Sequence, residues 1–153
     1  MSKAPSFKGF KPSSEKASRN LAKIKGTETV GEKLLRGALW RLGLRFRKNV
    51  KALPGKPDVV FPKEKVTVFC DGDFWHGRNW DKDRRRLQQG ANAPYWVAKI
   101  AANRERDKRY NRELRREGWA VIRMWESDVR ADPQRSAAMV AEIVLSKRGT
   151  NAK

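Results

Sequence analysis

The sequence is poor in several features whose scarcity narrows the possible functions. Its 153 residues include one cysteine, Cys70, so no internal disulfide can form and a cysteine-based zinc site would lack ligands. No apolar run is long enough to span a bilayer, and the N-terminal segment lacks the hydrophobic stretch of a signal peptide. We therefore expect a single intracellular domain, located in the cytoplasm with access to the nucleoid.

Acidic residues are also few. The chain has 17 Asp and Glu against 36 Lys and Arg, which gives a net charge of +19 and a pI near 10.7. An excess of this size is typical of proteins that bind a polyanion, and double-stranded DNA is the expected partner. Charge alone does not separate an enzyme from a basic ribosomal or nucleoid component, because neutralising a phosphate backbone needs no active site.

The segment Leu53–His76 has the pattern of a nuclease active site. A short apolar strand opens at Asp58, and a second strand after a turn delivers Asp71, Asp73 and His76 to its far end. Carboxylates are the hard oxygen ligands that Mg²⁺ prefers, and an imidazole near its working pKa can move a proton. The pattern predicts phosphodiester hydrolysis that depends on Mg²⁺, with Mn²⁺ able to substitute.

Two of these residues also have structural interpretations. Asp58 follows Pro57 and could cap a turn. His76 is the single histidine of the chain, and it could be buried and hydrogen-bonded without a chemical role. The presence of Asp58, Asp71 and His76 together favours the catalytic interpretation.

The remaining pattern predicts an α/β fold. Apolar residues at helical spacing indicate helices, and short apolar runs between turns indicate strands. The expected helices are Val30–Leu42, Tyr95–Glu117 and Asp132–Lys147, and the expected strands are Arg45–Val50, Asp58–Phe61, Val66–Cys70 and Ala120–Met124. The polar stretch Phe74–Pro94 is expected to be an excursion over the surface. This order predicts a mixed sheet with helices on both sides.

The ends of the chain differ from its middle in composition. Residues 1–26 mix Pro, Ser, Gly and Lys with few apolar residues, and we expect them to form a flexible basic arm. The folded domain is expected over residues 27–148. Residues 149–153 are expected to be a disordered tail.

Five segments carry a family resemblance. They are GTETVGEKLLRGALWRLGLRF, LPGKPDVVF, VFCDGDFWHG, YWVAKIAANRERD and GWAVIRMWE. In this order and spacing they closely resemble the very-short-patch-repair (Vsr-like) endonucleases, which nick DNA beside a T·G mismatch. The resemblance covers about Ser13 to Asp128, and LPGKPD followed by DGDFWHG is far more specific than a lone short motif. It implies a restriction-endonuclease-like mixed β-sheet flanked by helices, a divalent metal, and a role in repair or restriction.

The resemblance assigns roles to individual residues. Asp58 matches the family's metal-binding aspartate, and His76 matches a histidine implicated in catalysis. Asp71 lies where the Vsr type member has another active-site histidine and many relatives carry Asp. Cys70 matches a position that offers its backbone carbonyl to the metal. Glu32 matches a helix acid that reaches the metal through water, although its spacing is equally suited to a capping box.

The resemblance also implies contacts to DNA. Phe74, Trp75 and Trp96 match positions where the family pushes aromatic side chains into the base stack near the mismatch. Their alternative is ordinary core packing, which we favour for Trp40, Trp119 and Trp125. Basic residues of the arm and of the long helix are also expected to bind DNA, namely Lys16, Arg19, Lys23, Lys25 and Lys99.

One departure from the family concerns zinc. The family holds a structural zinc with Cys and His at four positions, which here are Asp73, Arg78, Trp80 and Ser127. None is a good thiolate or imidazole ligand, so no structural zinc is expected. Because that zinc pins the recognition loop in the family, the resemblance implies strand cleavage more firmly than T·G specificity. Phage defence or restriction is an alternative setting.

Two functions therefore stay open. The first is a metal-dependent endonuclease that acts as a monomer and nicks one strand, because one active site cuts one strand. The second is a non-catalytic DNA-binding module on a diverged nuclease fold. The joint presence of Asp58, Asp71 and His76 favours the first. No motif identifies the recognition sequence or a recruiting protein partner.

Overall fold

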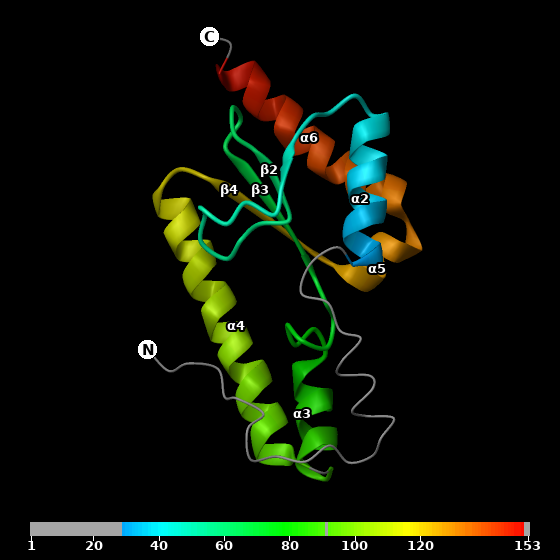
Figure 1. The fold of residues 1–153 in the computed structure, drawn as a ribbon, viewed down its shortest axis with the longest axis vertical. Helices are drawn as coiled ribbons and strands as arrows, with labels where there is room; N and C mark the ends of the chain where they lie inside the picture. Colours follow the sequence, from blue (N-terminus) through cyan, green and yellow to red (C-terminus); the bar gives the residue numbers. More distant parts are fainter. Residues whose placement is uncertain (1–28, 91, 152–153) are drawn as a thin grey trace.

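A mixed four-stranded β-sheet forms the centre of the computed structural model, which describes residues 29–90 and 92–151 (Figure 1). The strands lie in the order β1 (Arg47–Lys48), β2 (Val59–Phe61), β3 (Val66–Asp71) and β4 (Ala120–Trp125). Strand β2 is antiparallel to both of its neighbours, β1 and β3, whereas β3 and β4 run parallel.

Helices cover both sides of this sheet (Figure 1). On one side lie α2 (Val30–Arg41), α5 (Glu126–Ala131) and α6 (Pro133–Asn151), and on the other lies α4 (Ala93–Arg116). The core forms on the three-helix side, where Leu39 of α2, Val68 of β3 and Val144 of α6 belong to one buried cluster. The predicted α/β fold, with a mixed sheet flanked by helices, is confirmed.

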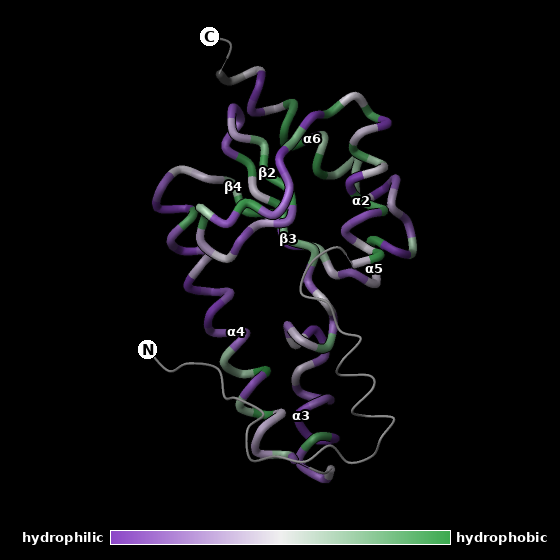
Figure 2. The backbone as a smooth tube through the Cα atoms, viewed as in Figure 1, coloured by the Kyte–Doolittle hydropathy of each residue, from purple (hydrophilic) through white to green (hydrophobic). Residues whose placement is uncertain are grey.

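Helix α3 (Trp80–Gln88) lies beside the first half of α4, and the two helices extend away from the sheet (Figure 1). Both are hydrophilic over most of their length, whereas the apolar positions gather around the sheet (Figure 2). None of the residues of α3 is buried. The pair therefore forms a polar projection and adds little to the core.

The parallel pairing of β3 and β4 decides where the candidate site forms. Asp71 pairs with Trp125, so both strands end at the same edge of the sheet. Asp58 reaches this edge from the other direction, because β2 is antiparallel to β3 and the Asp58 N–H donates to the Val68 carbonyl at 3.0 Å. The edge thus gathers the residues that precede β2 and those that follow β3 and β4.

Several predicted elements are confirmed, and others need correction. The first helix begins at Val30 as expected, with the Thr29 Oγ1 accepting the Glu32 N–H at 3.3 Å. The first strand is shorter than the predicted Arg45–Val50, because Asn49 adopts a positive φ of 50° directly after it. The excursion predicted over Phe74–Pro94 contains helix α3, which has no apolar stripe to reveal it.

Two further corrections concern the C-terminal part and the tryptophans. The last helix runs to Asn151, so residues 149–151 are helical although they were expected in a disordered tail. Trp40 is 55% exposed, and the prediction that it packs in the core is wrong. The Arg45 guanidinium lies 3.3 Å from its ring centroid and covers it. Trp119 and Trp125 are partly exposed and also lie outside the core cluster.

The basic arm expected over residues 1–26, including Lys16, Arg19, Lys23 and Lys25, lies outside the described residues. Among the helices that the structure describes, none is long and apolar enough to cross a membrane.

Candidate active site

Asp58 lies at the centre of a group of buried acids. Its Oδ2 accepts the Cys70 N–H at 2.7 Å, which orients the carboxyl at the end of β3. Burial raises the pKa of Asp58 to about 7; the hydrogen bond from Cys70 opposes this rise, and the neighbouring Glu32 and Asp71 add to it. A buried acid group held in this way fits a divalent cation, which would relieve the repulsion and accept oxygen ligands.

Glu32 joins this group from the first turn of α2. It is 2% exposed, and its carboxyl forms a side-chain hydrogen bond with Asp58 as well as an ion pair with Arg36 at 3.4 Å. Thr29 caps the Glu32 N–H, so one half of the predicted capping box is present. The Glu32 carboxyl nevertheless faces the other acids, and the structure therefore suits both interpretations of this residue.

A further acid, Glu126, was not predicted from the sequence. Its Oε1 accepts the Gly31 N–H at 3.3 Å. A Cβ on Gly31 would lie 2.4 Å from the Glu126 Cγ and 3.2 Å from the Cys70 Sγ. Only glycine allows the start of α2 to approach the strand ends this closely, and this approach brings Glu32 to the site.

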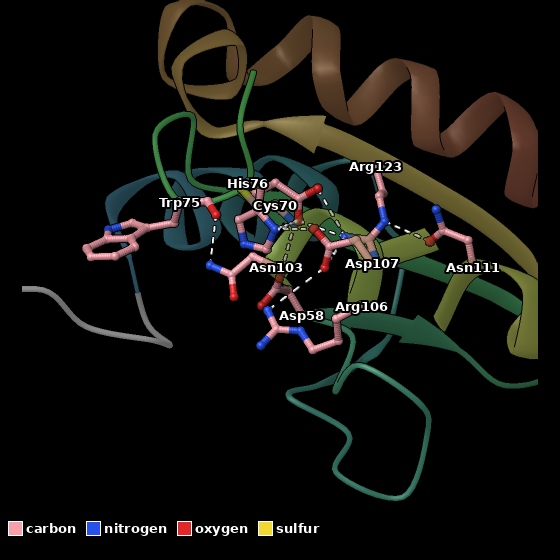
Figure 3. A network of polar contacts seen from close by, with 10 residues as sticks. Asp58, Cys70, Trp75, His76, Asn103, Arg106, Asp107, Asn111 and Arg123 are labelled. Carbon is pink, nitrogen blue, oxygen red and sulfur yellow. Dashed lines mark hydrogen bonds and ion pairs between the residues drawn. The ribbon is translucent and has the colours of Figure 1, made fainter. Parts of the chain in front are cut away.

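His76 is held by an aspartate that sequence reasoning also missed. Its Nδ1 lies 2.5 Å from Asp107 Oδ2 (Figure 3). The same nitrogen lies 3.7 Å from Asp71 Oδ1. Burial lowers the pKa of His76, but the hydrogen bond with Asp107 and the charges of both aspartates outweigh it and raise the pKa overall. The pairing favours the protonated imidazole. Asp107 contacts Nδ1, so the other ring nitrogen, Nε2, is not bound to Asp107.

Asp71 is paired with Arg123 of β4. The Arg123 Nη1 donates to both Asp71 carboxylate oxygens at 3.0 and 3.1 Å. The Arg123 Nε donates to Asn111 Oδ1 at 2.7 Å (Figure 3). Burial raises the pKa of Asp71, while the charges of His76 and Arg123 oppose the rise. The Arg123 Nη2 is buried beside the acids and has no hydrogen-bond partner among the described residues.

Donor atoms of Asp71, His76 and Asp107 all lie within 4.8 Å of one another, so these three residues could hold a metal ion. The sequence predicted Asp58 and Asp71 as a pair. In the structure Asp71 neighbours Asp58 and also belongs to the group with His76 and Asp107. Asp107 was missed because it is one acid in a charged helical run, where spacing gives no sign that it faces His76 across 31 residues.

The segment 72–79, which we call the site loop, carries His76 between two fixed points. The Asn103 Nδ2 donates to the Trp75 carbonyl at 2.9 Å, and the His76 N–H donates to the Gly72 carbonyl at 3.1 Å. Gly77 has a φ of 71°, and a Cβ there would lie 2.7 Å from the Arg104 Cδ. Helix α4 therefore supports the loop along its length.

The three aromatic residues predicted to contact DNA form one cluster. Ring centroids are 5.3 Å apart for Phe74 and Trp75, 5.5 Å for Trp75 and Trp96, and 6.0 Å for Phe74 and Trp96. All three are partly exposed and lie outside the main buried core. The three rings therefore pack against one another beside the site and outside the core cluster.

His76 lines three cavities, and two of them are large. One, of about 610 Å³, is lined by Glu32, Cys70, Trp75 and Lys99, the helix residue predicted to bind DNA. The other, of about 620 Å³, is lined mainly by loop residues 51–56 and by basic and aromatic side chains; its charged residues are Lys51, Lys56, His76, Arg106, Asp107 and Arg123. The first cavity thus combines the acids Glu32 and Glu126 with the cations Lys99 and Arg106, whereas cations outnumber acids in the second.

The four positions of the family's structural zinc hold groups that do not fit that metal. Arg78 is a permanent cation, and the Trp80 indole nitrogen can only donate a hydrogen bond. The Asp73 carboxylate already accepts the Ser127 N–H at 3.0 Å. Tetrahedral structural zinc needs thiolate or imidazole ligands, and this set offers none.

The raised pKa of Asp58 predicts a stability effect that depends on pH. The folded-state pKa of about 7 lies above the value near 4 expected in the unfolded chain, so wild-type stability falls as pH rises between them. Asn cannot ionise. We therefore expect the change in the free energy of unfolding caused by Asp58→Asn in the metal-free protein to be about 2 to 4 kcal/mol more favourable at pH 8 than at pH 4.5.

Urea unfolding in chelator at the two pH values measures this difference. Asp81→Asn, on the exposed face of α3, is the control for loss of one negative charge. An Asp58→Asn effect that is equal at both pH values would contradict the assigned environment.

Comparisons with known proteins find related DNA endonucleases. The family model of the DNA mismatch endonuclease Vsr matches residues 11–82. The type II nicking enzyme V.NmeDIP of Neisseria meningitidis serogroup C is 42% identical over 90% of this chain and 90% of its own length. The type II nicking enzyme V.HpaIIP of Haemophilus parainfluenzae is 37% identical over 87% of this chain and 92% of its own.

The DNA mismatch endonuclease Vsr of Escherichia coli is more distant, at 34% identity over 74% of this chain and 70% of its own length. The similarity to the nicking enzymes spans nearly the whole of both chains and includes the strand edge described above. The chain therefore belongs to the Vsr family of DNA mismatch endonucleases and related nicking enzymes.

Proposed function

We propose that this protein is a Mg²⁺-dependent endonuclease that hydrolyses one phosphodiester bond in one strand of duplex DNA. The observation that carries the proposal is the convergence of Asp58, Asp71, His76 and Asp107 at one edge of the sheet, in a chain of net charge +19. The nicking activity named for its relatives supports the same reaction.

Asp58 and Asp71, together with the Cys70 carbonyl, are the proposed metal ligands. Mg²⁺ bound there would place positive charge beside the phosphate and lower the pKa of a bound water. Mn²⁺ offers similar chemistry. Glu32 lies beside Asp58 and would reach the metal through a bound water. Arg123 holds the Asp71 carboxylate in place through two hydrogen bonds and would thereby orient this ligand toward the metal.

His76 has the proposed role of proton donor. Asp107 occupies its Nδ1 and favours the protonated ring, so Nε2 carries the proton that can pass to the leaving oxygen. Asp107 also fixes the orientation of the ring, as a carboxylate does for many catalytic histidines.

Duplex DNA would bind through three surfaces. The cationic hollow beside His76 suits phosphates that flank the cleaved bond, and the neighbouring cavity adds the cation Lys99 of α4 as a second surface. The aromatic cluster of Phe74, Trp75 and Trp96 suits insertion beside a weakened base pair. We assign a monomer, because one active site per chain accounts for one cut strand. The protein would act on the chromosome in the cytoplasm.

Duplex oligonucleotides labelled separately on each strand test the proposal. We expect Mg²⁺-dependent cleavage of one strand, and comparing a T·G mismatch with a matched pair separates a repair specificity from a restriction or defence setting. Equal cutting of both strands would contradict the nickase. Tight binding without cleavage of any duplex would favour the DNA-binding module.

The basic arm gives a separate prediction. Deleting residues 1–25 removes seven cations, Lys3, Lys8, Lys11, Lys16, Arg19, Lys23 and Lys25. Binding to all sequences should weaken alike, and the slope of log K against log salt should flatten by about 0.9 for each phosphate that the arm no longer neutralises. Nicking should remain measurable at low salt, since no proposed ligand lies in the arm. An unchanged affinity and salt slope would show that the arm is only a tether.

A further inference from the structure

Both ends of the site loop contact the start of α5. From the loop, Asp73 Oδ1 accepts the Ser127 N–H at 3.0 Å, and Asp73 Oδ2 accepts the Ser127 hydroxyl. Arg78 Nη1 donates to Ser127 Oγ at 2.7 Å and to Asp128 Oδ1 at 3.0 Å. Four side chains, two from each segment, thus satisfy one another.

The sheet topology makes this contact possible. The loop follows β3 and α5 follows β4, and the two strands are parallel and end together, so residues 49 to 54 positions apart meet. Within the loop, the Arg78 N–H donates to the Asp73 carbonyl at 2.9 Å, and Arg78 Nη1 lies 3.3 Å from Asp73 Oδ2. The loop is therefore closed on itself at the same place where it is tied to α5.

The closed loop holds the residues that matter for the reaction. Phe74, Trp75 and His76 lie between Asp73 and Arg78, so both flanks of this tripeptide are fixed. The α4 contacts from Asn103 and Asp107 hold its middle. With the ends released, the middle contacts alone would have to order the whole loop against its conformational entropy.

We propose that Asp73, Arg78, Ser127 and Asp128 form a metal-free clamp that positions Phe74, Trp75 and His76 before DNA binds. This inference rests on the proposed function, which gives Phe74 and Trp75 a role in DNA binding and His76 a role in catalysis. Three of the four clamp residues occupy positions where the resembled family has zinc ligands, and here hydrogen bonds and ion pairs connect the loop to α5.

The electrostatics of the clamp agree with this role. Burial would raise the pKa of Asp73, but the hydrogen bonds from Ser127 and Arg78 outweigh it and lower the pKa. The Asp73 and Arg78 side chains are 31% and 32% exposed. Salt reaches such a cluster, so the clamp should loosen as ionic strength rises, unlike a site held by metal–ligand bonds.

Hydrogen exchange of the loop amides in the metal-free and DNA-free protein tests the clamp independently of nicking. We expect Asp73→Asn and Ser127→Ala each to speed exchange at His76, Gly77 and Arg78 by about 3- to 10-fold. The double variant should show less than the product of the two effects, because both remove the same contact. Ser127→Thr, which keeps the hydroxyl, should retain slow exchange.

The matched control is Arg86→Gln on α3, which breaks the ion pair of 3.4 Å between the exposed Arg86 and Asp83 and should leave loop exchange unchanged. In nicking assays the clamp variants should also lower kcat/KM, and Ser127→Thr should restore it. Loop exchange that is unchanged in Asp73→Asn would overturn the clamp. One zinc per chain, with loop exchange that rises in chelator, would overturn it equally.

Discussion

Asp58→Asn is expected to slow strand nicking by about 1,000-fold or more, while the affinity for duplex DNA stays within about twofold. The carboxylate is the proposed metal ligand, and removing its charge takes away several kcal/mol of stabilisation of the transition state. The basic surface that binds phosphate is left intact. Single-turnover nicking and gel-shift affinity, both measured with Mg²⁺, give the two quantities.

Asp81→Asn is the matched control, because it removes the same charge from an exposed position on α3. It should nick like the wild type. Near wild-type nicking by Asp58→Asn would remove Asp58 from the active site and with it the proposed metal position.

His76→Gln and Asp107→Asn should each reduce the nicking rate by about 100- to 10,000-fold, with His76→Gln costing less than Asp58→Asn. Metal-bound water keeps some reactivity without a proton donor, which explains the smaller loss. Asp107→Asn has a further signature. Because the hydrogen bond with Asp107 raises the pKa of His76, its loss should shift the His76 limb of the pH–rate profile to lower pH.

Glu105→Gln is the control for Asp107→Asn, since Glu105 lies on the same helix and is 74% exposed. It should leave both the rate and the profile unchanged. A pH profile that does not move in Asp107→Asn would contradict the assigned role of Asp107. Loss of the cooperative thermal transition in His76→Gln would instead identify a structural role for the histidine.

The parts of the fold that were predictable have strong local patterns. Helix α2 has an N-cap and helical spacing, and β3 is an apolar run bounded by a turn, so their bounds were predicted to within one residue. Helices α3 and α5 were missed because α3 buries no residue and α5 has six residues with Val129 as its buried position. Local patterns reveal elements that bury a continuous apolar face.

The site divides in the same way. Asp58, Asp71 and His76 lie in one segment of 19 residues, which made the constellation visible in the sequence. Asp107 and Arg123 reach the same place from α4 and β4, across 31 to 52 residues. Their roles depend on strand register and helix rotation, and no local spacing encodes these. Glu126 depends likewise on the absence of a side chain at Gly31.

The most direct test of the central claim is incubation of the purified full-length protein with supercoiled plasmid and Mg²⁺, with chelator as the blank. The account predicts conversion to open circles without linear product at early times, and no conversion by Asp58→Asn. Plasmid that stays supercoiled, although the protein binds it, would contradict the account and identify a DNA-binding module on a nuclease fold.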